Sequence, residues 1–112
     1  ACLKNNLKPI LCIGEKLGED RKEVIKKQLK GIKGKNIIIA YEPQWAIGTG
    51  KTPTLDDIKE SYELIKKIVP QNKVLYGGSV NSTNAKEILD ITEGVLVGGA
   101  SVDKKEFLKM IK

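Results

Sequence analysis

Glu42 stands between an apolar run and a glycine-containing segment, and it is the residue in this chain best placed for proton transfer. Residues 37–40 are Ile-Ile-Ile-Ala, and the segment after Glu42 contains Pro43, Trp45 and the Gly48-Thr49-Gly50 triplet. A carboxylate at the end of a buried strand, beneath a loop, suits a general base, because burial raises its pKa and removes water. The pattern makes Glu42 a candidate general base, and the motifs further along the chain decide between this interpretation and the plainer one. The alternative is a strand-end glutamate that happens to precede a glycine loop.

Paired glycines followed by a serine mark two later strand ends. They are Gly77-Gly78-Ser79 and Gly98-Gly99-Ala100-Ser101. Glycine lets the backbone come close to a ligand, and free N–H groups at a helix start bind anions. Two such turns in succession predict a phosphate site. The alternative, that the glycines only make tight strand-to-helix turns, is weaker for two turns than for one.

Residues 48–52, Gly-Thr-Gly-Lys-Thr, look like the end of a nucleotide-binding P-loop. That motif requires a glycine five residues before its Gly-Lys pair, and Trp45 occupies this position. The segment therefore does not predict a nucleoside triphosphate site.

Four short apolar runs without alternation predict strands that are buried on both faces. They span residues 9–13, 36–41, 73–76 and 94–97. A helical pattern follows each run, over residues 20–32, 56–69, 83–89 and 104–111. This order predicts an α/β fold of parallel βα units, with functional residues at the carboxyl ends of the strands.

Two of the helices carry start signals. Thr54 and Asp57 have the spacing of a capping box, and Asp103 is expected to cap the last helix, with Glu106 three residues on. Phe107 and Ile111 are expected to pack at i, i+4 in that helix.

The composition describes one small domain of 112 residues with a net charge of +6. The lysines alternate with acidic residues along the predicted helices, which is typical of solvated faces. One Phe, three Tyr and one Trp are not interleaved with the basic residues, so base stacking has little support. An anionic small substrate fits the charge better than a nucleic acid.

The cysteine and histidine content points to no metal, cofactor or disulfide framework. Cys2 and Cys12 are the only cysteines, there is no histidine, and Cys12 is expected to be a small buried filler in its strand. The apolar runs fall far short of the roughly 20 residues that span a membrane. A cytoplasmic location is therefore expected. The chain starts at Ala1, in what reads as the tail of a helix, which indicates missing upstream residues.

Three ordered motifs resemble the triosephosphate isomerase family. They are residues 41–52, 76–80 and 97–101, and residues 9–15 are similar as well. The resemblance runs over residues 1–112 and implies the second half, four βα units, of a TIM (β/α)8 barrel of about 250 residues. Residues 1–112 are thus expected to form a C-terminal half-barrel domain, and the full-length protein a homodimer.

The resemblance also implies roles in the interconversion of dihydroxyacetone phosphate and glyceraldehyde 3-phosphate, a step of glycolysis and gluconeogenesis. Glu42 would move the proton between the two carbons. The phosphate would be held by backbone N–H groups of Gly48, Ser79, Gly98 and Gly99. The lid over the substrate would include Pro43, Trp45, Gly50 and Lys51, with Tyr76 and Ser79 holding it closed. Cys12 would pack near Glu42, and Lys73 would pair with Glu93.

The chain departs from the family pattern in several places. The family's Lys and Asn from the first strand and its electrophilic His from the fourth have no counterpart, so the isolated chain is expected to be inactive. Gln44 replaces a residue that is usually apolar in the family. Pro53 has no N–H for the Tyr76 latch.

Three hypotheses follow. In the leading one, the chain is the C-terminal half of a triosephosphate isomerase, which carries the catalytic base. In the second, it is a non-catalytic half-barrel that binds sugar phosphate. In the third, it is a structural half-barrel that self-associates to cover its open sheet edges.

Overall fold

The computed structural model describes residues 1–47 and 52–111 of the chain. Its sheet has three parallel strands in the order β1-β2-β3, namely β1 (Ile10–Ile13), β2 (Ile38–Tyr41) and β3 (Val74–Tyr76). In the register, Cys12 lies opposite Ala40, and Ala40 lies opposite Leu75. The predicted α/β fold with a parallel sheet is confirmed.

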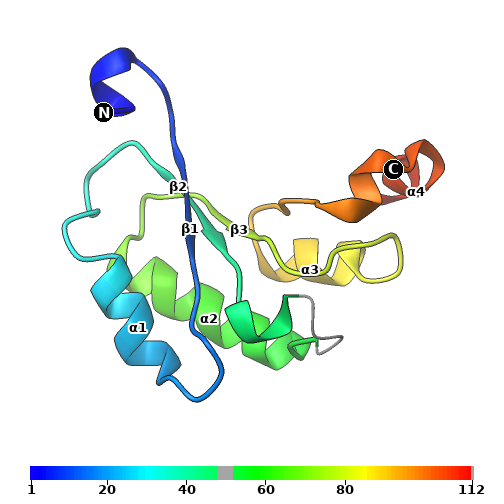
Figure 1. Ribbon diagram of the computed structural model, residues 1–112, viewed down its shortest axis with the longest axis horizontal. Coiled ribbons are helices and arrows are strands. Elements are labelled where there is room, and N and C mark those ends of the chain that lie inside the picture. Colours follow the sequence, from blue (N-terminus) through cyan, green and yellow to red (C-terminus); the bar gives the residue numbers. More distant parts are fainter. Residues whose placement is uncertain (48–51, 112) are drawn as a thin grey trace.

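A helix follows each strand segment in the chain. The helices are α1 (Arg21–Gln28), α2 (Leu55–Ile68), α3 (Ala85–Ile91) and α4 (Lys104–Met110). Three short 3₁₀ turns are η1 (Leu3–Asn5), η2 (Gln44–Ala46) and η3 (Gly99–Val102). Figure 1 shows α1 and α2 together along one side of the strands, with α3 and α4 following beyond β3. In the described part of the chain, no helix is both long and apolar enough to cross a membrane.

The helix starts follow the capping signals in the sequence. The side chain of Thr54 accepts a hydrogen bond from the backbone of Asp57, and the Asp57 carboxylate accepts one from the backbone of Thr54, so the capping box is confirmed. Asp103 caps α4 as predicted, by accepting from the N–H groups of Lys105 and Glu106.

Two helices differ in extent from their predictions. α1 ends at Gln28 rather than at residue 32, because Gly31, with a φ of 80°, and Gly34 turn the chain away from the helix. α3 begins at Ala85, because the side chain of Asn81 accepts hydrogen bonds from the N–H groups at positions 83 and 84 and holds a turn there.

Residues 94–97 do not form the full strand that the sequence predicts. Val95 makes one isolated parallel bridge with Tyr76. Around it, the N–H of Tyr76 donates to the carbonyl of Gly94 at 3.0 Å and the N–H of Leu96 donates to the carbonyl of Tyr76 at 2.8 Å. The sheet therefore extends to this segment by a single bridge. No described strand pairs with its outer edge.

The core lies between the sheet and the helices. Ile39, Tyr41 and Val74 of the strands are buried against Ile25 of α1 and Ile65 of α2. The prediction that both sheet faces are buried is wrong for β1. On the face turned away from the core helices, Ala40 of β2 is 0% exposed, whereas Ile10 of the edge strand β1 is 46% exposed and its neighbour Cys12 is exposed.

The packing of Phe107 against Ile111 stays a prediction. Phe107 packs against the core, whereas Ile111 is 63% exposed. α4 ends at Met110, so Ile111 lies beyond the last helical turn.

Candidate functional site

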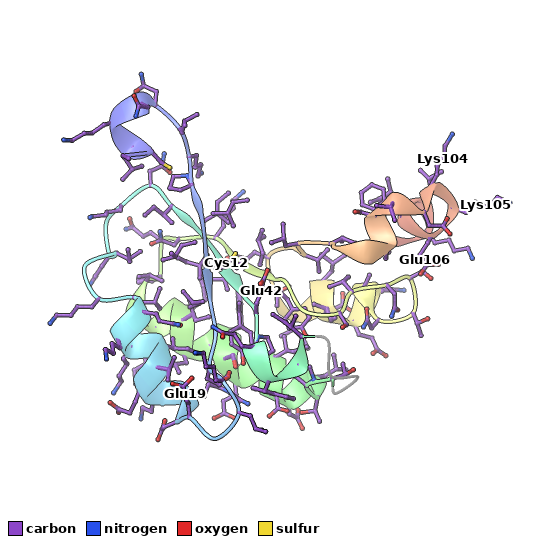
Figure 2. The ribbon with its side chains drawn as sticks, in the orientation of Figure 1. Cys12, Glu19, Glu42, Lys104, Lys105 and Glu106 are labelled. Carbon is purple, nitrogen blue, oxygen red and sulfur yellow. The ribbon has the colours of Figure 1, made fainter. Side chains whose placement is uncertain are left out.

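Glu42 follows β2 directly and is tied to the neighbouring strand. Its backbone N–H donates to the carbonyl of Ile13 at 2.7 Å, which extends the β1–β2 pairing by one residue. The side chain is half-buried. Figure 2 shows Glu42 and Cys12 next to each other at the centre of the sheet.

Glu42 can lie here because the ends of the two flanking strands carry glycines, which have no side chain in the way. A Cβ at Gly77 would lie 2.6 Å from Oε1 of Glu42, and a Cβ at Gly14 would lie 1.8 Å from its carbonyl oxygen. Both distances are shorter than a Cβ atom tolerates, so the Glu42 backbone and carboxylate sit where a side chain would otherwise be. The sequence patterns did not indicate Gly14, although its place directly after a strand end was a signal.

A cavity of about 410 Å³ opens beside the Glu42 carboxylate. Its wall includes the predicted base and three of the predicted phosphate-binding residues. The lining residues are Glu42, Ala46, Ile47, Gly77, Gly78, Ser79, Val80, Asn81, Gly98, Gly99 and Ala100. The structure therefore brings the two glycine turns and Glu42 around one space.

Each of the two glycine turns has a carbonyl that accepts hydrogen bonds from a nearby residue. The side-chain amide of Asn84 donates to the carbonyl of Ser79 at 2.9 Å. The carbonyl of Gly98 accepts from the N–H and the hydroxyl of Ser101, at 2.9 and 2.6 Å. A Cβ at Gly98 or Gly99 would meet no atom within 4 Å, so this backbone faces open space.

The predicted lid is described only at its ends. Gly48, Gly50 and Lys51 lie outside the described residues. Gly48 is also one of the predicted phosphate ligands. Pro43 is buried and precedes η2, which contains Trp45. The lid role of this segment stays a prediction.

Gln44, a departure from the family pattern, has polar partners here. Its N–H donates to the carbonyl of Glu15 at 2.9 Å, and its side-chain amide lies 3.5 Å from the carbonyl of Gly14. Both contacts join the start of the 43–53 segment to the end of β1.

Tyr76 is buried, with its ring centroid 6.3 Å from that of Tyr41. A Cβ at Gly78 would lie 1.9 Å from its hydroxyl oxygen, so the phenol fits against a glycine backbone. Burial raises the pKa of Tyr76 to about 12. Within residues 1–47 and 52–111 the hydroxyl has no hydrogen-bond partner, and its latch role stays a prediction.

Cys12 is near Glu42 as expected but is not a buried filler. It is exposed on the sheet face opposite to that of the half-buried Leu11 and the buried Ile13, because successive side chains of a strand point to opposite faces. Its Sγ lies 3.8 Å from Oε1 of Glu42. Partial burial and the charge of the Glu42 carboxylate raise the pKa of the thiol.

The expected ion pair between Lys73 and Glu93 is wrong. Glu93 pairs with Lys66 of α2, whose Nζ lies 3.2 Å from Oε2, and it accepts from the N–H of Val74 at 2.8 Å. Lys66 also donates to the carbonyl of Asn72. Lys73 is exposed. The prediction failed because the lysine that reaches Glu93 comes from α2, behind β3, and not from the start of β3.

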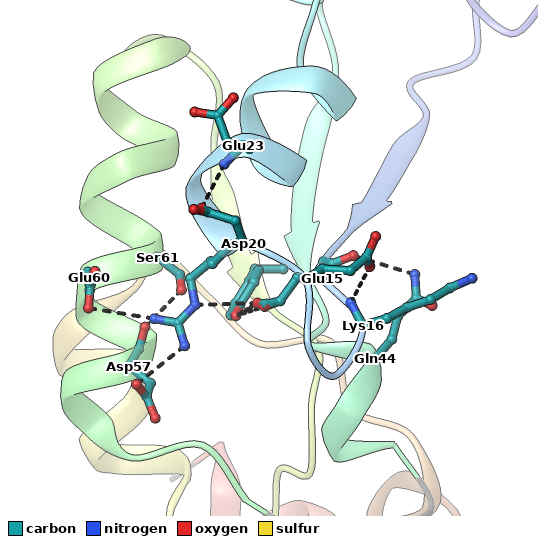
Figure 3. A network of polar contacts seen from close by, with 12 residues as sticks. Glu15, Lys16, Asp20, Glu23, Gln44, Asp57, Glu60 and Ser61 are labelled. Atoms are coloured by element: carbon teal, nitrogen blue, oxygen red, sulfur yellow. Dashed lines mark hydrogen bonds and ion pairs between the residues drawn. The ribbon is translucent and has the colours of Figure 1, made fainter.

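A buried polar network behind Glu42 was not indicated by the sequence patterns. Glu15 is 3% exposed, its carboxylate accepts from the hydroxyl of Tyr41, and Arg21 lies beside it. Burial and then this hydrogen bond raise the pKa of Tyr41. Figure 3 shows Glu15 facing Asp57, Glu60 and Ser61 of α2 across this network. The available signal was that Glu15 follows β1 much as Glu42 follows β2.

Comparison with known proteins places these features in one family. The sequence model of the family described as triosephosphate isomerase matches residues 1–112. A triosephosphate isomerase of Mycoplasma mobile is 46% identical over 98% of this chain and 50% of its own length. That of Thermodesulfovibrio yellowstonii is 45% identical over 100% of this chain and 53% of its own, and that of Coprinopsis cinerea 42% over 99% and 53%.

The chain spans about half the length of the curated relatives it matches. The match covers both glycine turns, the Glu42 strand end and the βα units that bring them together. This chain belongs to the triosephosphate isomerase family.

Proposed function

We propose that this chain forms the base and phosphate side of a triosephosphate isomerase site, which interconverts dihydroxyacetone phosphate and glyceraldehyde 3-phosphate. The observation that carries the proposal is the cavity of about 410 Å³ shared by Glu42, Ser79, Gly98 and Gly99. An anion held on the two glycine turns would place the rest of a three-carbon substrate next to the only carboxylate in the cavity lining described here. No cofactor takes part in this proposal.

The chemistry needs one base that serves both carbons. The Glu42 carboxylate takes the proton from one carbon of the bound triose phosphate and returns it to the neighbouring carbon. The hydroxyl proton moves from one substrate oxygen to the other in the same reaction, and that transfer is assigned to the complementary half. Backbone N–H groups of the turns hold the phosphate, so that the two carbons stay within reach of one carboxylate. Phosphate binding is assigned to Gly48, Ser79, Gly98 and Gly99.

The segment after Glu42 is proposed to close over the substrate. An enediolate next to a phosphate loses that phosphate readily in water, and a lid excludes water, as is established for this family. The lid residues are Pro43, Trp45, Gly50 and Lys51, with Tyr76 holding the closed form.

The remainder of the site is proposed to come from a complementary half. The chain has no histidine to act as the electrophile. We propose that residues 1–112 are the C-terminal half-barrel domain, that the complementary half covers the sheet face of Ile10 and Cys12, and that the chain alone is inactive. The proposal includes a homodimeric full-length protein and a cytoplasmic location.

A single-chain chimera tests the proposed function. The half of the Mycoplasma mobile relative that this chain does not match is fused ahead of residues 1–112, and isomerisation of glyceraldehyde 3-phosphate is followed by a coupled assay. We expect activity in the parent chimera and a loss of at least about a hundredfold in kcat for Glu42→Gln, since removing a positioned general base costs roughly 10²–10⁴ in rate. Glu60→Gln, which changes an exposed carboxylate on α2, is the matched control.

The relative itself serves as the positive control for the assay. A chimera that melts cooperatively but does not turn over substrate would overturn the proposal, as would full activity in the Glu42→Gln variant.

Phosphate binding without turnover is the second candidate. It is favoured by the open backbone at Gly98 and Gly99 together with the absence of histidine from the chain. Calorimetry of the 112-residue chain with glycerol phosphate tests it. No heat at millimolar ligand would exclude binding by the chain alone.

A further inference from the structure

Arg21, the first residue of α1, contacts carboxylates from two separate parts of the chain. Its Nε lies 3.4 Å from Oε1 of Glu15, in an ion pair without the geometry of a hydrogen bond. Its Nη2 lies 3.3 Å from Oδ1 of Asp57, and its Nη1 lies 3.6 Å from Oε2 of Glu60. Glu15 follows β1, while Asp57 and Glu60 belong to the first turns of α2.

The contact with Glu15 reaches the start of the segment that links β2 to α2. The Glu15 carboxylate accepts from the hydroxyl of Tyr41, the residue before Glu42, and the Glu15 carbonyl accepts from the N–H of Gln44 at 2.9 Å. Glu15 therefore holds residues on both sides of Glu42.

The contact with Asp57 reaches the other end of the same segment. The second carboxylate oxygen of Asp57 accepts from the N–H of Thr54 at 3.1 Å, and the Asp57 N–H donates to the Thr54 hydroxyl at 3.0 Å. Thr54 is the N-cap of α2 and directly follows the 43–53 segment.

We propose that Arg21 is a positioning residue that fixes both ends of the 43–53 segment relative to each other, and with them the place of Glu42 at the cavity. Its effect on catalysis rests on the proposed function, whereas its effect on the two ends does not. One guanidinium joins the Glu15 end to the Asp57 end, so a change at one end reaches the other through Arg21.

Arginine suits this role for a geometric reason. Its planar guanidinium presents donors in a fixed fork, whereas a lysine ammonium is one point charge on a flexible stem. Arg21 is also the cation that lies next to the buried Glu15 carboxylate, so its removal would leave that charge uncompensated. A variant that keeps the positive charge and loses the fork separates positioning from simple charge compensation.

Amide hydrogen exchange of the 112-residue chain, followed by NMR, tests the connection. In Arg21→Lys we expect exchange at Gln44 and Thr54 to accelerate by about tenfold, the size of a typical coupling between contacting residues, with the β2 amide of Ile39 changed by less than about twofold. Glu60→Gln, at the 76% exposed arm of the network, should change none of the three amides by more than about twofold.

Glu15→Gln is the second variant, and it replaces Arg21→Lys in the test if that variant does not fold. Glu15 and Thr54 share no hydrogen bond in the described part of the chain, so faster exchange at Thr54 in this variant supports transmission through Arg21. Unchanged exchange at Thr54, or an equal acceleration at all three amides, would overturn the proposal.

Kinetics of the chimera described above supply the catalytic arm. In Arg21→Lys we expect kcat to fall about tenfold, while the Kd for inorganic phosphate stays within about twofold, because the phosphate turns are not part of the network. A rise in the phosphate Kd with kcat unchanged would contradict the proposal that Arg21 positions Glu42. A parent chimera without activity would refute the proposed function, and the exchange experiment would still decide the role of Arg21.

Discussion

The carboxylate of Glu42 rests on the backbone of Gly77. A Cβ at position 77 would lie 2.6 Å from Oε1 of Glu42 and 2.7 Å from its Cγ. Both residues line the cavity, at the ends of neighbouring strands. The glycine therefore sets how far the carboxylate can move toward β3.

Gly77→Ala is expected to displace the base and to leave the fold in place. The side chain of Glu42 can rotate away from the new methyl group, so the melting temperature should change little. Misplacement of a catalytic group by about 1 Å costs on the order of a hundredfold, so kcat of the chimera should fall by about that factor. Parental kcat with an intact fold would show that Gly77 does not fix the carboxylate.

Gly14→Ala should instead act on stability. Its Cβ would lie 1.8 Å from the backbone carbonyl oxygen of Glu42, and a backbone atom cannot rotate away. We expect a loss of about 3 kcal/mol in the free energy of unfolding, measured by urea denaturation, at the upper end of overpacking effects. Gly34→Ala is the control: it adds a methyl group in open space at a φ of 85° and should cost about 1 kcal/mol. Equal losses in the two variants would contradict this assignment.

Tyr76→Phe should separate stability from activity. Among the described residues the buried hydroxyl has no partner, and an unsatisfied buried polar group costs about 1–3 kcal/mol, so its removal should raise the free energy of unfolding by about 1 kcal/mol. If the hydroxyl latches the lid, kcat of the chimera should fall at the same time.

Tyr62→Phe, on the half-buried face of α2, is the matched control and should leave kcat unchanged. Full activity of Tyr76→Phe would contradict the latch, and a loss of stability would contradict the assignment of the hydroxyl as an unsatisfied buried group.

The capping box of α2 should make stability depend on pH through Asp57. Burial alone would raise the pKa of this carboxyl, but hydrogen bonds from Thr54 and Arg21 outweigh it and lower the pKa below its ordinary value of 3.8. A depressed pKa contributes stability that is complete above the unfolded value and is lost as the pH falls through the folded value. Asp57→Asn should therefore be about 1 kcal/mol less stable than the parent at pH 6, with the difference shrinking below pH 3.8.

Asp56→Asn changes the same charge in the same helical turn and is the control for net charge and helix dipole. Thermal unfolding of the three proteins across this pH range checks the prediction. A constant difference between the parent and Asp57→Asn at all pH values would show that ionisation of Asp57 is not involved.

Local signals in the sequence predicted much of the fold and of the site. The apolar runs before Glu42 and Gly77, the Thr54 capping box and the Asp103 cap each depend on residues close in the chain, and the structure has them all. The shared cavity followed from one rule, that the ends of parallel strands meet at one edge of a sheet.

Contacts between distant segments could not be read in the same way. Glu93 pairs with Lys66 rather than Lys73 because α2 packs behind β3, and the sequence does not specify which lysine that packing brings near. The ion pairs of Arg21 depend on how α1 and α2 meet. Cys12 is exposed at the edge strand β1, although that strand is as apolar as a buried one.

The single bridge between Tyr76 and Val95 divides the proposed phosphate site, formed by the turns at Ser79 and at Gly98 and Gly99, into two parts of unequal strength. Ser79 follows a strand that is paired within the sheet, whereas Gly98 and Gly99 follow a segment that has one bridge to β3, flanked by the hydrogen bonds between Glu93 and Val74. Subglobal opening of residues 94–111 would thus abolish the proposed phosphate site while the three-stranded sheet persisted. Occupancy by a phosphate would draw the two parts together, so the ligand would contribute its binding free energy to the docking of the last βα unit.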